Sequence, residues 1–329
     1  MKVYRTLAEL VAEKRAVYLA IGVFDGVHLG HQRVISQACV EARPTGGLAV
    51  ALTFDPHPIR VLRPDQAPPL LTSTPHKLAL LQQQGLDACL LIHFDNAFAA
   101  TPAEEFVAQI AFCRHICVGT RFHFGHQRAG NPALLTQLAL RYGFGVEEIK
   151  PVLTPAGEMI SSTAIRQHIQ DGNLDRAAAM LGRPFSILGT VEKGDGVGRQ
   201  LGFPTANLNS HHEAFPPDGV YVCRVGLVGQ ASRLSPASTG DRQDGCPTTN
   251  FNGVINLGRR PTFSGRSHQR VLEVHILDFN QDIYGQEIEV IFVSKLRNEQ
   301  KFESISALKT QIAADILSAR QIVDGRPAH

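Results

Sequence analysis

A short run of glycine and histidine separates an apolar strand from a helix near the amino terminus, and it restricts the fold more than any other feature. Residues 22–31 read Gly-Val-Phe-Asp-Gly-Val-His-Leu-Gly-His. The preceding run, Val17–Ile21, is continuously apolar, which is typical of a strand buried in a parallel sheet. The apolar spacing of His31–Glu41 predicts a helix. The chain therefore makes a strand–loop–helix turn, with His28 in the loop and His31 at the helix start.

The same alternation continues to about residue 185 and predicts a doubly wound α/β domain. Strands that alternate with helices form parallel sheets covered on both faces, and ligands bind at the carboxyl ends of the strands. His28 and His31 follow one such end. The predicted strands are Val17–Phe24, Leu48–Phe54, Ala88–Phe94, Ile116–Gly119 and Gly145–Val152, and the predicted helices are His31–Glu41, Pro75–Gln84, Pro102–Ala111, Asn131–Tyr142 and Thr163–Gln170.

After Gly182–Ser186 the pattern changes to short strands separated by glycine, proline and aspartate. Five or six such strands, rich in β-branched and aromatic residues, indicate a small antiparallel barrel. We therefore expect two domains, 1–185 and 186–329, each long enough to bury a core. The predicted barrel strands are Ile187–Glu192, Gly219–Val228, Gly253–Leu257, Arg270–Phe279 and Glu287–Ser294.

Two further segments belong to the second domain. Gln230–Asn250 is rich in serine, threonine, glycine and aspartate, which predicts a mobile insertion between strands. A helix closes the chain and is predicted to present one apolar face. The residues assigned to that face are Ile305, Leu308, Ile312 and Ile316, together with Leu317.

The composition is that of a soluble globular protein. Its 32 basic and 30 acidic side chains are interspersed, and the formal net charge of +2 argues against a dedicated nucleic-acid surface. No apolar run reaches the ~18 residues that span a bilayer, and the amino terminus lacks the apolar core of a secretory signal. The six cysteines are dispersed, mostly in apolar segments, which indicates reduced thiols and a cytoplasmic location. Cys113 and Cys117 lack the second pair of a zinc site, so no metal is assigned to them.

The chemistry of the histidine run follows from its position at a helix start. Unpaired backbone N–H groups there favour an anion. Two imidazoles beside that anion can neutralise the charge that builds on a triphosphate during attack at phosphorus. The alternatives are a glycine-rich turn with two surface histidines, or a His-x-x-His metal pair. No further His, Cys or Asp cluster stands nearby at metal-ligand spacing, so we favour the phosphate interpretation.

A second motif, Ile160–Arg166, reads Ile-Ser-Ser-Thr-Ala-Ile-Arg and opens a predicted helix. Its serines can cap the first turn, and the same N–H groups can hold the β- and γ-phosphates of a nucleotide. Arg166 adds positive charge to that site. Capping alone would account for the serines if the motif stood in isolation.

Together these motifs resemble the nucleotidylyltransferase superfamily. The form Gly-x-Phe-Asp-Gly-Val-His-x-Gly-His resembles the bacterial bifunctional riboflavin kinase/FMN adenylyltransferase (FAD synthetase) family, although the loop alone also allows a pantetheine-phosphate or nicotinamide-mononucleotide adenylyltransferase. The resemblance implies that His28 and His31 are catalytic. It also implies that ATP is bound by Gly22, Phe24, Gly30, Ser161, Ser162, Thr163 and Arg166.

Other stretches of the first half fit the same family, with one departure. Arg121 stands where the family usually has aspartate or asparagine, so no ligand contact is assigned to it. His123 and His126 are interpreted as turn residues, because the family pattern has no metal there. The matching stretches are Thr53–Pro58, Leu71–Thr72 with Lys77, and the string within Val118–Gly130.

The second half carries the run Gly189–Asn207, which resembles the riboflavin kinase signature Gly-Phe-Pro-Thr-Ala-Asn. Its three alternating glycines allow a backbone flap to lie against phosphates. They are not a dinucleotide fingerprint, because Phe-Pro-Thr follows them rather than a helix. Thr205 and Asn207 offer hard oxygen ligands that suit Mg²⁺, whereas the tripeptide alone would be only a proline turn. The glycines are Gly194, Gly196 and Gly198.

The resemblance extends through Gly258–Phe263, Glu273–Phe279, Tyr284–Gly285, Leu296–Arg297 and Lys301–Phe302. A glutamate on a strand usually faces solvent. The family's catalytic base occupies the position of Glu273, so the resemblance implies that Glu273 accepts the proton of the ribityl hydroxyl as it attacks the γ-phosphorus of ATP. Arg297 is assigned as a contact to the flavin on the same basis.

The resemblance thus implies two activities on one chain. The barrel phosphorylates riboflavin with ATP and Mg²⁺, and the α/β nucleotidylyltransferase domain transfers AMP from a second ATP to FMN, which gives FAD and pyrophosphate. The expected partners are the small molecules ATP, riboflavin and FMN, with no nucleic acid and no membrane. The alternatives are a monofunctional adenylyltransferase whose barrel only binds flavin, and a non-catalytic flavin sensor.

Overall fold

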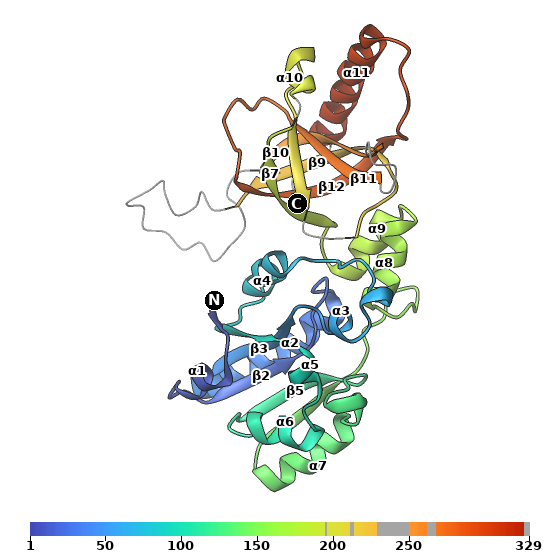
Figure 1. Ribbon diagram of the computed structural model, residues 1–329. Helices are drawn as coiled ribbons and strands as arrows, with labels where there is room; N and C mark the ends of the chain where they lie inside the picture. The colour runs from blue at the N-terminus through green and yellow to red at the C-terminus, as the bar shows by residue number, and fades with distance from the viewer. Residues whose placement is uncertain (195, 211–213, 229–249, 262–267, 326–329) are drawn as a thin grey trace, which may run out of the picture. The chain divides into compact units, whose positions relative to one another are not determined.

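The computed structural model describes residues 1–194, 196–210, 214–228, 250–261 and 268–325 (Figure 1). Contacts divide the chain into two compact units. The first comprises Met1–Ile165 and Met180–Gly182, and the second comprises Arg166–Ala179 and Arg183–His329. The division falls inside a helix, α8 (Ser162–Gln170).

The first unit contains a six-stranded sheet in the order β1-β4-β3-β2-β5-β6, and every neighbouring pair is parallel. The predicted doubly wound α/β architecture is therefore confirmed. The order reverses between β2 and β5, which is the switch point where sheets of this kind bind ligands. The strands are β1 (Lys2–Tyr4), β2 (Val17–Ile21), β3 (Leu48–Asp55), β4 (Ala88–His93), β5 (His115–Gly119) and β6 (Gly145–Ile149).

Helices cover both faces of this sheet (Figure 1). Alternate residues of β3 show why: Val50 and Leu52 belong to one apolar cluster, and Ala49 and Ala51 belong to the other. The described helices up to residue 181 are α1 (Leu7–Val11), α2 (Leu29–Ala42), α3 (Pro58–Leu62), α4 (Thr74–Gln82), α5 (Asn96–Ala99), α6 (Ala103–Ile110), α7 (Pro132–Tyr142), α8 and α9 (Leu174–Leu181), with short 3₁₀ turns at Arg43–Thr45, Pro64–Gln66 and His126–Arg128.

Two predicted boundaries around the histidine run were wrong. The strand ends at Ile21 rather than Phe24, because Phe24 takes a left-handed backbone with φ 54° that no strand accommodates. The helix begins at Leu29 rather than His31, because His28 caps it and His31 lies inside its first turn. His126 begins a 3₁₀ turn, as predicted, whereas His123 lies in irregular backbone outside any turn.

The second unit contains a closed antiparallel barrel in the order β10-β11-β8-β7-β12-β9, followed by a helix, as predicted. One of its strands, β8, was absent from the predicted strands. The elements are β7 (Ser186–Glu192), α10 (Val197–Leu201), β8 (Ala206–Ser210), β9 (Gly219–Leu227), β10 (Asn250–Pro261), β11 (His268–Ile276), β12 (Glu287–Arg297) and α11 (Ile305–Asp324).

The apolar face predicted for the last helix was wrong at its edges. Ile305 is 67% exposed and Leu317 is 60% exposed, whereas Asp315 and Ala319 are buried. Ile305 is the first residue of α11, and Leu317 is turned by about 100° from its neighbour Ile316. The predicted insertion Gln230–Asn250 lies outside the described residues, apart from Asn250 at the start of β10.

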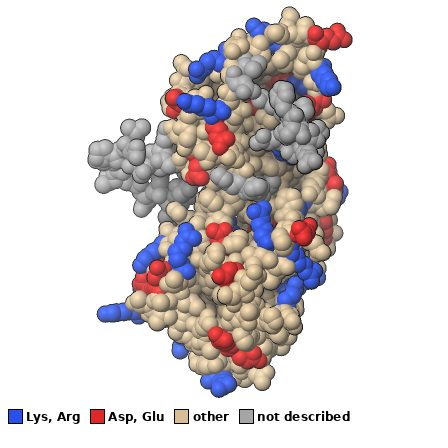
Figure 2. Space-filling view, viewed as in Figure 1, with Lys and Arg blue, Asp and Glu red and all other residues tan. Residues whose placement is uncertain are grey.

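Charged side chains of both signs are interspersed over the face that Figure 2 shows. Within the described parts of the chain, no helix combines the length and the apolar composition needed to cross a bilayer.

Burial on both faces of the sheet makes its central strands sensitive to cavities. We expect Leu90→Ala, on β4, to lower the free energy of unfolding of the first unit by about 2–5 kcal/mol, because Leu90 is fully buried. The control is Leu140→Ala on α7, where the side chain is 85% exposed and the change should stay within ~0.5 kcal/mol. Urea unfolding followed by circular dichroism measures both, and equal effects would contradict the layered core.

Candidate active sites

The two histidines of the first motif stack at the start of α2. His28 is the N-cap, and its Nδ1 accepts a hydrogen bond from the backbone N–H of His31 at 3.3 Å. The neutral His28 ring therefore carries its proton on Nε2. The two imidazole rings lie almost parallel, with centroids 3.6 Å apart. His28 thus places its Nε2–H donor beside the N-terminus of α2, the positive end of that helix dipole.

His31 lies in a setting that opposes protonation. Its Nδ1 is shielded from solvent and has no hydrogen-bond partner among the described residues. Burial holds the pKa of His31 well below 6.5, and the nearby His28 and Lys77 lower this pKa further. The Phe24 and His31 rings are nearly perpendicular, with centroids 5.4 Å apart. Without a bound anion, His31 is neutral at neutral pH.

A buried carboxylate holds the histidine loop in shape. The Asp25 carboxylate accepts hydrogen bonds from the backbone N–H groups of Leu71 at 2.9 Å and Thr72 at 3.1 Å. Both Phe24 and Val27 adopt positive φ angles, 54° and 42°, that non-glycine residues rarely take. Such strain persists only where the surroundings fix it. The hydrogen bonds of Asp25 provide that constraint.

Lys77 also contacts the histidine loop, through the carbonyl of Val23. Its Nζ donates to the carbonyl of Phe54 at 3.0 Å, to the Thr53 hydroxyl at 3.2 Å and to the Val23 carbonyl at 3.4 Å. The side chain is buried, and burial lowers the pKa of Lys77. The Lys77 ammonium is thus held by three oxygen acceptors, and it is close enough to His31 to lower the pKa of that imidazole.

The serine motif meets the histidine loop directly. The Ser162 hydroxyl donates to the Asp25 carbonyl at 2.9 Å, and the Ser161 hydroxyl accepts from the backbone N–H of Ala164 at 3.2 Å. A Cβ on Gly30 would lie 3.1 Å from the His28 ring and 3.9 Å from the Ile160 carbonyl, so this glycine lies between the two motifs. Two helix N-termini, from α2 and α8, thus face one loop.

The remaining predicted residues of this site differ in exposure. Phe24 is 1% exposed, and its ring packs where a Gly22 Cβ would stand, 2.7 Å away. The Phe24 ring contacts His31 and influences the site through that contact. Thr163 is exposed in the first turn of α8, and Arg166 follows Ser162 by four residues, on the same side of the helix.

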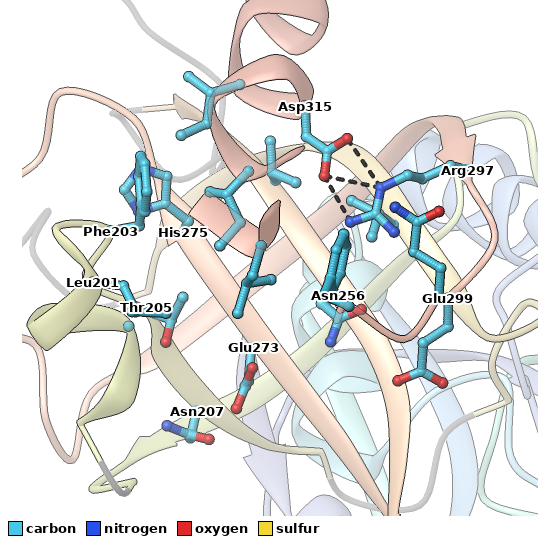
Figure 3. A pocket seen from close by; sticks show the side chains of 18 of the residues that line it. Leu201, Phe203, Thr205, Asn207, Asn256, Glu273, His275, Arg297, Glu299 and Asp315 are labelled. Carbon is cyan, nitrogen blue, oxygen red and sulfur yellow. Dashed lines mark hydrogen bonds and ion pairs between the residues drawn. The ribbon is translucent and has the colours of Figure 1, made fainter. Parts of the chain in front are cut away.

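The barrel carries a pocket of about 350 Å³ on its outer wall (Figure 3). On β11, Leu272 and Val274 are buried, while Glu273 and His275 alternate with them and line the pocket. The full lining is Gly196, Gly198, Leu201, Phe203, Thr205, Asn207, Val220, Val254, Asn256, Glu273, His275, Arg297, Glu299, Gln300, Phe302, Leu308, Ile312, Asp315 and Ile316.

Strand register builds the polar floor of this pocket. Asn207 pairs with Glu273, Glu273 pairs with Asn256, Asn256 pairs with Val220, and Val220 pairs with Arg297. Residues directly opposite one another on neighbouring strands point to the same face. Five residues from five strands therefore form one row, with Asn207 and Arg297 at its two ends (Figure 3).

The segment that contains Gly194 and Gly198 packs closely against Thr205 and Asn207, at one end of that row. A Cβ on Gly194 would lie 1.9 Å from the Asn207 amide, and a Cβ on Gly198 would lie 2.9 Å from the Thr205 hydroxyl. Any other residue at position 194 would displace the Asn207 side chain, and a Cβ at position 198 would also lie 2.5 Å from the Phe203 carbonyl oxygen. Gly196, which precedes α10, has φ 70°.

Arg297 is fixed at the other end of the row by Asp315 of α11. Its Nε and Nη2 donate to the Asp315 carboxylate at 2.8–3.0 Å, and Gln311 donates to the same carboxylate at 2.9 Å. Asp315 is 5% exposed, and the guanidinium lies over the Phe302 ring, 5.7 Å from its centroid. A bidentate pair of this kind fixes the plane of the guanidinium.

Several residues of these sites were not singled out from the sequence as site residues. Asp25 and Lys77 lay inside matching stretches, but their contacts join segments far apart in the chain. Asn256 is an ordinary strand residue until its register is known. Helical spacing alone would have flagged Asp315, because it is a carboxylate between the apolar residues Ile312 and Ile316.

Comparison with known proteins assigns both halves. A family model described as FAD synthetase matches residues 10–164, and one described as riboflavin kinase matches residues 181–323. A bifunctional riboflavin kinase/FMN adenylyltransferase from Escherichia coli (strain K12) is 37% identical over 326 residues, which cover 98% of this chain and 97% of the relative.

Two further comparisons cover most of the chain. The bifunctional riboflavin kinase/FMN adenylyltransferase of Haemophilus influenzae is 37% identical over 306 residues, 92% of each chain. A crystal structure named as a macrolide-efflux protein from Streptococcus pneumoniae has a TM-score of 0.77 and 30% identity, and it covers 97% of this chain and 98% of that one. With a matching model on each half and relatives over nearly its whole length, the chain belongs to the bifunctional riboflavin kinase/FMN adenylyltransferase family.

Proposed function

We propose that the barrel pocket phosphorylates riboflavin and that the histidine loop adenylylates the FMN that results. The observation that carries this assignment is the strand register, since Asn207 and Glu273 are direct partners on the floor of one pocket. The two activities then divide between the predicted domains, 1–185 and 186–329. The substrates are ATP, riboflavin and FMN.

In the kinase step, Glu273 accepts the proton of the terminal ribityl hydroxyl as that oxygen attacks the γ-phosphorus of ATP. The bond between the γ-phosphorus and the bridging oxygen of ADP breaks at the same time. The glycines Gly194, Gly196 and Gly198 offer backbone N–H groups to the phosphates. Arg297 contacts the flavin from the opposite end of the pocket, oriented by Asp315.

Thr205 and Asn207 are the residues that would hold Mg²⁺. Both line the pocket, and they provide a hydroxyl and an amide oxygen, the hard donors that this ion prefers. The close packing of Gly194 and Gly198 against them supports a fixed orientation of both side chains. When bound, the ion would neutralise phosphate charge.

In the adenylyl transfer, a phosphate oxygen of FMN attacks the α-phosphorus of ATP and pyrophosphate leaves. His28 donates from Nε2 to the oxygens of the pentacoordinate phosphorus, and His31 adds a second imidazole as negative charge develops. Phe24 orients His31. The pyrophosphate is held by the N-terminus of α8, with Ser161, Ser162 and Thr163, and by Arg166. Gly22 and Gly30 keep the loop close to the nucleotide.

We further propose a cytoplasmic location. The five cysteines among the described residues are all free and buried, as in proteins of reducing compartments.

The experiment that tests the two activities is a product assay on the full chain with riboflavin, ATP and Mg²⁺. We expect FMN and then FAD, with one ATP consumed at each step, and a chelator should stop both until Mg²⁺ is restored. Formation of FMN without FAD at saturating ATP would contradict the bifunctional assignment.

Asn207→Ala should raise the Mg²⁺ concentration needed for FMN formation and leave the Mg²⁺ concentration needed for FAD formation from FMN unchanged.

The histidine pair should matter for one activity only. We expect His28→Ala and His31→Ala each to slow FAD formation from FMN by about 100- to 1000-fold, because each removes a contact to the transition state. FMN formation from riboflavin should be unchanged. Chromatographic separation of the flavins measures both, with the exposed His126→Ala as control. Near-normal adenylyl transfer in either variant would make these histidines ordinary loop residues.

Glu273→Gln should have the opposite selectivity. The amide keeps the size of the side chain but cannot accept the hydroxyl proton, so riboflavin phosphorylation should fall by ~10²–10⁴-fold. FMN supplied directly should still be converted to FAD. The matched control is the exposed Glu303→Gln, which should leave both rates unchanged. A variant at position 273 that phosphorylates riboflavin normally would refute the base assignment.

A further inference from the structure

Three potential metal ligands meet on the parallel sheet, and none of them belongs to either proposed site. They are His115 and Cys117 of β5 and Glu147 of β6, and one ligand atom from each lies within 4.8 Å of the other two. In the parts of the chain that the structure describes, no other group of three or more His, Cys, Asp or Glu side chains meets this condition. His115 begins β5, so it lies about 13 Å from the carboxyl end of that strand, where nucleotide would bind.

The register of the two strands creates this cluster. Cys117 is paired with Glu147, and His115 is paired with Gly145. Residues two apart on a strand share a face, so all three ligands lie on one side of the sheet. A Cβ on residue 145 would lie 2.3 Å from the His115 Nδ1, so only glycine leaves the imidazole where it is.

One polar atom of the cluster, the His115 Nε2, is shielded from solvent and has no hydrogen-bond partner among the described residues. Cys117 is fully buried and lies opposite Glu147 on the neighbouring strand. An unpaired ring nitrogen beside a buried thiol and a carboxylate is unfavourable unless a cation joins them.

We infer that His115, Cys117 and Glu147 bind a zinc ion. One nitrogen, one sulfur and one oxygen donor suit this borderline metal, and three protein ligands leave a fourth position for water. On binding, the Cys117 thiol loses its proton to solvent as the zinc–sulfur bond forms. His115 and Glu147 are half-buried and β6 is an edge strand, so the ion can enter from the side of the sheet.

Cys113 provides a matched control within the same segment. It is also a buried free thiol. It belongs to the apolar cluster on the opposite face of the sheet from Cys117. Cys113→Ser and Cys117→Ser each remove one buried thiol, but only Cys117→Ser removes a proposed metal ligand.

The test uses Co²⁺ as a spectroscopic substitute for zinc in the full-length, tag-free chain after removal of metals. We expect a thiolate-to-cobalt charge-transfer band in the near ultraviolet, visible bands of four-coordinate cobalt, and loss of both on addition of Zn²⁺. Cys117→Ser should abolish the charge-transfer band, His115→Gln and Glu147→Gln should weaken cobalt binding at least tenfold, and Cys113→Ser should match the unaltered chain.

Two results would overturn the inference. One is the absence of a thiolate band in the unaltered chain, and the other is a band that persists in Cys117→Ser. Circular dichroism verifies that each variant is folded. If Cys117→Ser fails to fold, Glu147→Gln decides, because its side chain is half-buried and the change preserves size. Unweakened cobalt binding in that variant would exclude the site.

Discussion

The hydrogen bonds that the Asp25 carboxylate accepts from the Leu71 and Thr72 backbone are the constraint on which the nucleotide site depends. They constrain a loop in which two residues other than glycine, Phe24 and Val27, have positive φ angles, and such strain persists only where the surroundings fix it. The same residue joins the second motif, since its carbonyl accepts the Ser162 hydroxyl. One aspartate therefore fixes both the shape of the loop and its distance from α8.

The barrel site depends on a different kind of constraint. No single side chain assembles it; the register of successive strands does, by bringing Asn207, Glu273 and Asn256 into one row. A shift of one residue in any strand would turn its member of the row to the other face. The packed interior, with Leu272, Val274 and Ile255, fixes that register, so the row of side chains on the outer face depends on the apolar core.

The chemistry of this chain was readable from its sequence, and the supporting contacts were not. Motif residues such as His28 and Glu273 lie in contiguous runs whose spacing is visible. The strand β8 was not predicted because Asn207, Asn209 and Ser210 have weak strand preference, and pairing with β7 and β11 imposes the extended conformation. The pairing of Arg297 with Asp315 was not readable either, since the spacing that marks Asp315 within its helix does not specify how that helix approaches the barrel.

Because the pocket lies on the outer face of the barrel, core packing and the presentation of polar side chains use different faces of the same strands. The inner face of each strand is committed to packing, and the outer face carries the reactive groups, so one can vary without the other. The far wall of the pocket is α11, through Leu308, Ile312 and Ile316. Exchange of that one helix would alter this wall of the pocket and remove Asp315, the partner of Arg297, and it would leave Asn207, Glu273 and Asn256 in place on their strands. The fold thus builds one wall of the pocket from a segment that takes no part in the strand register.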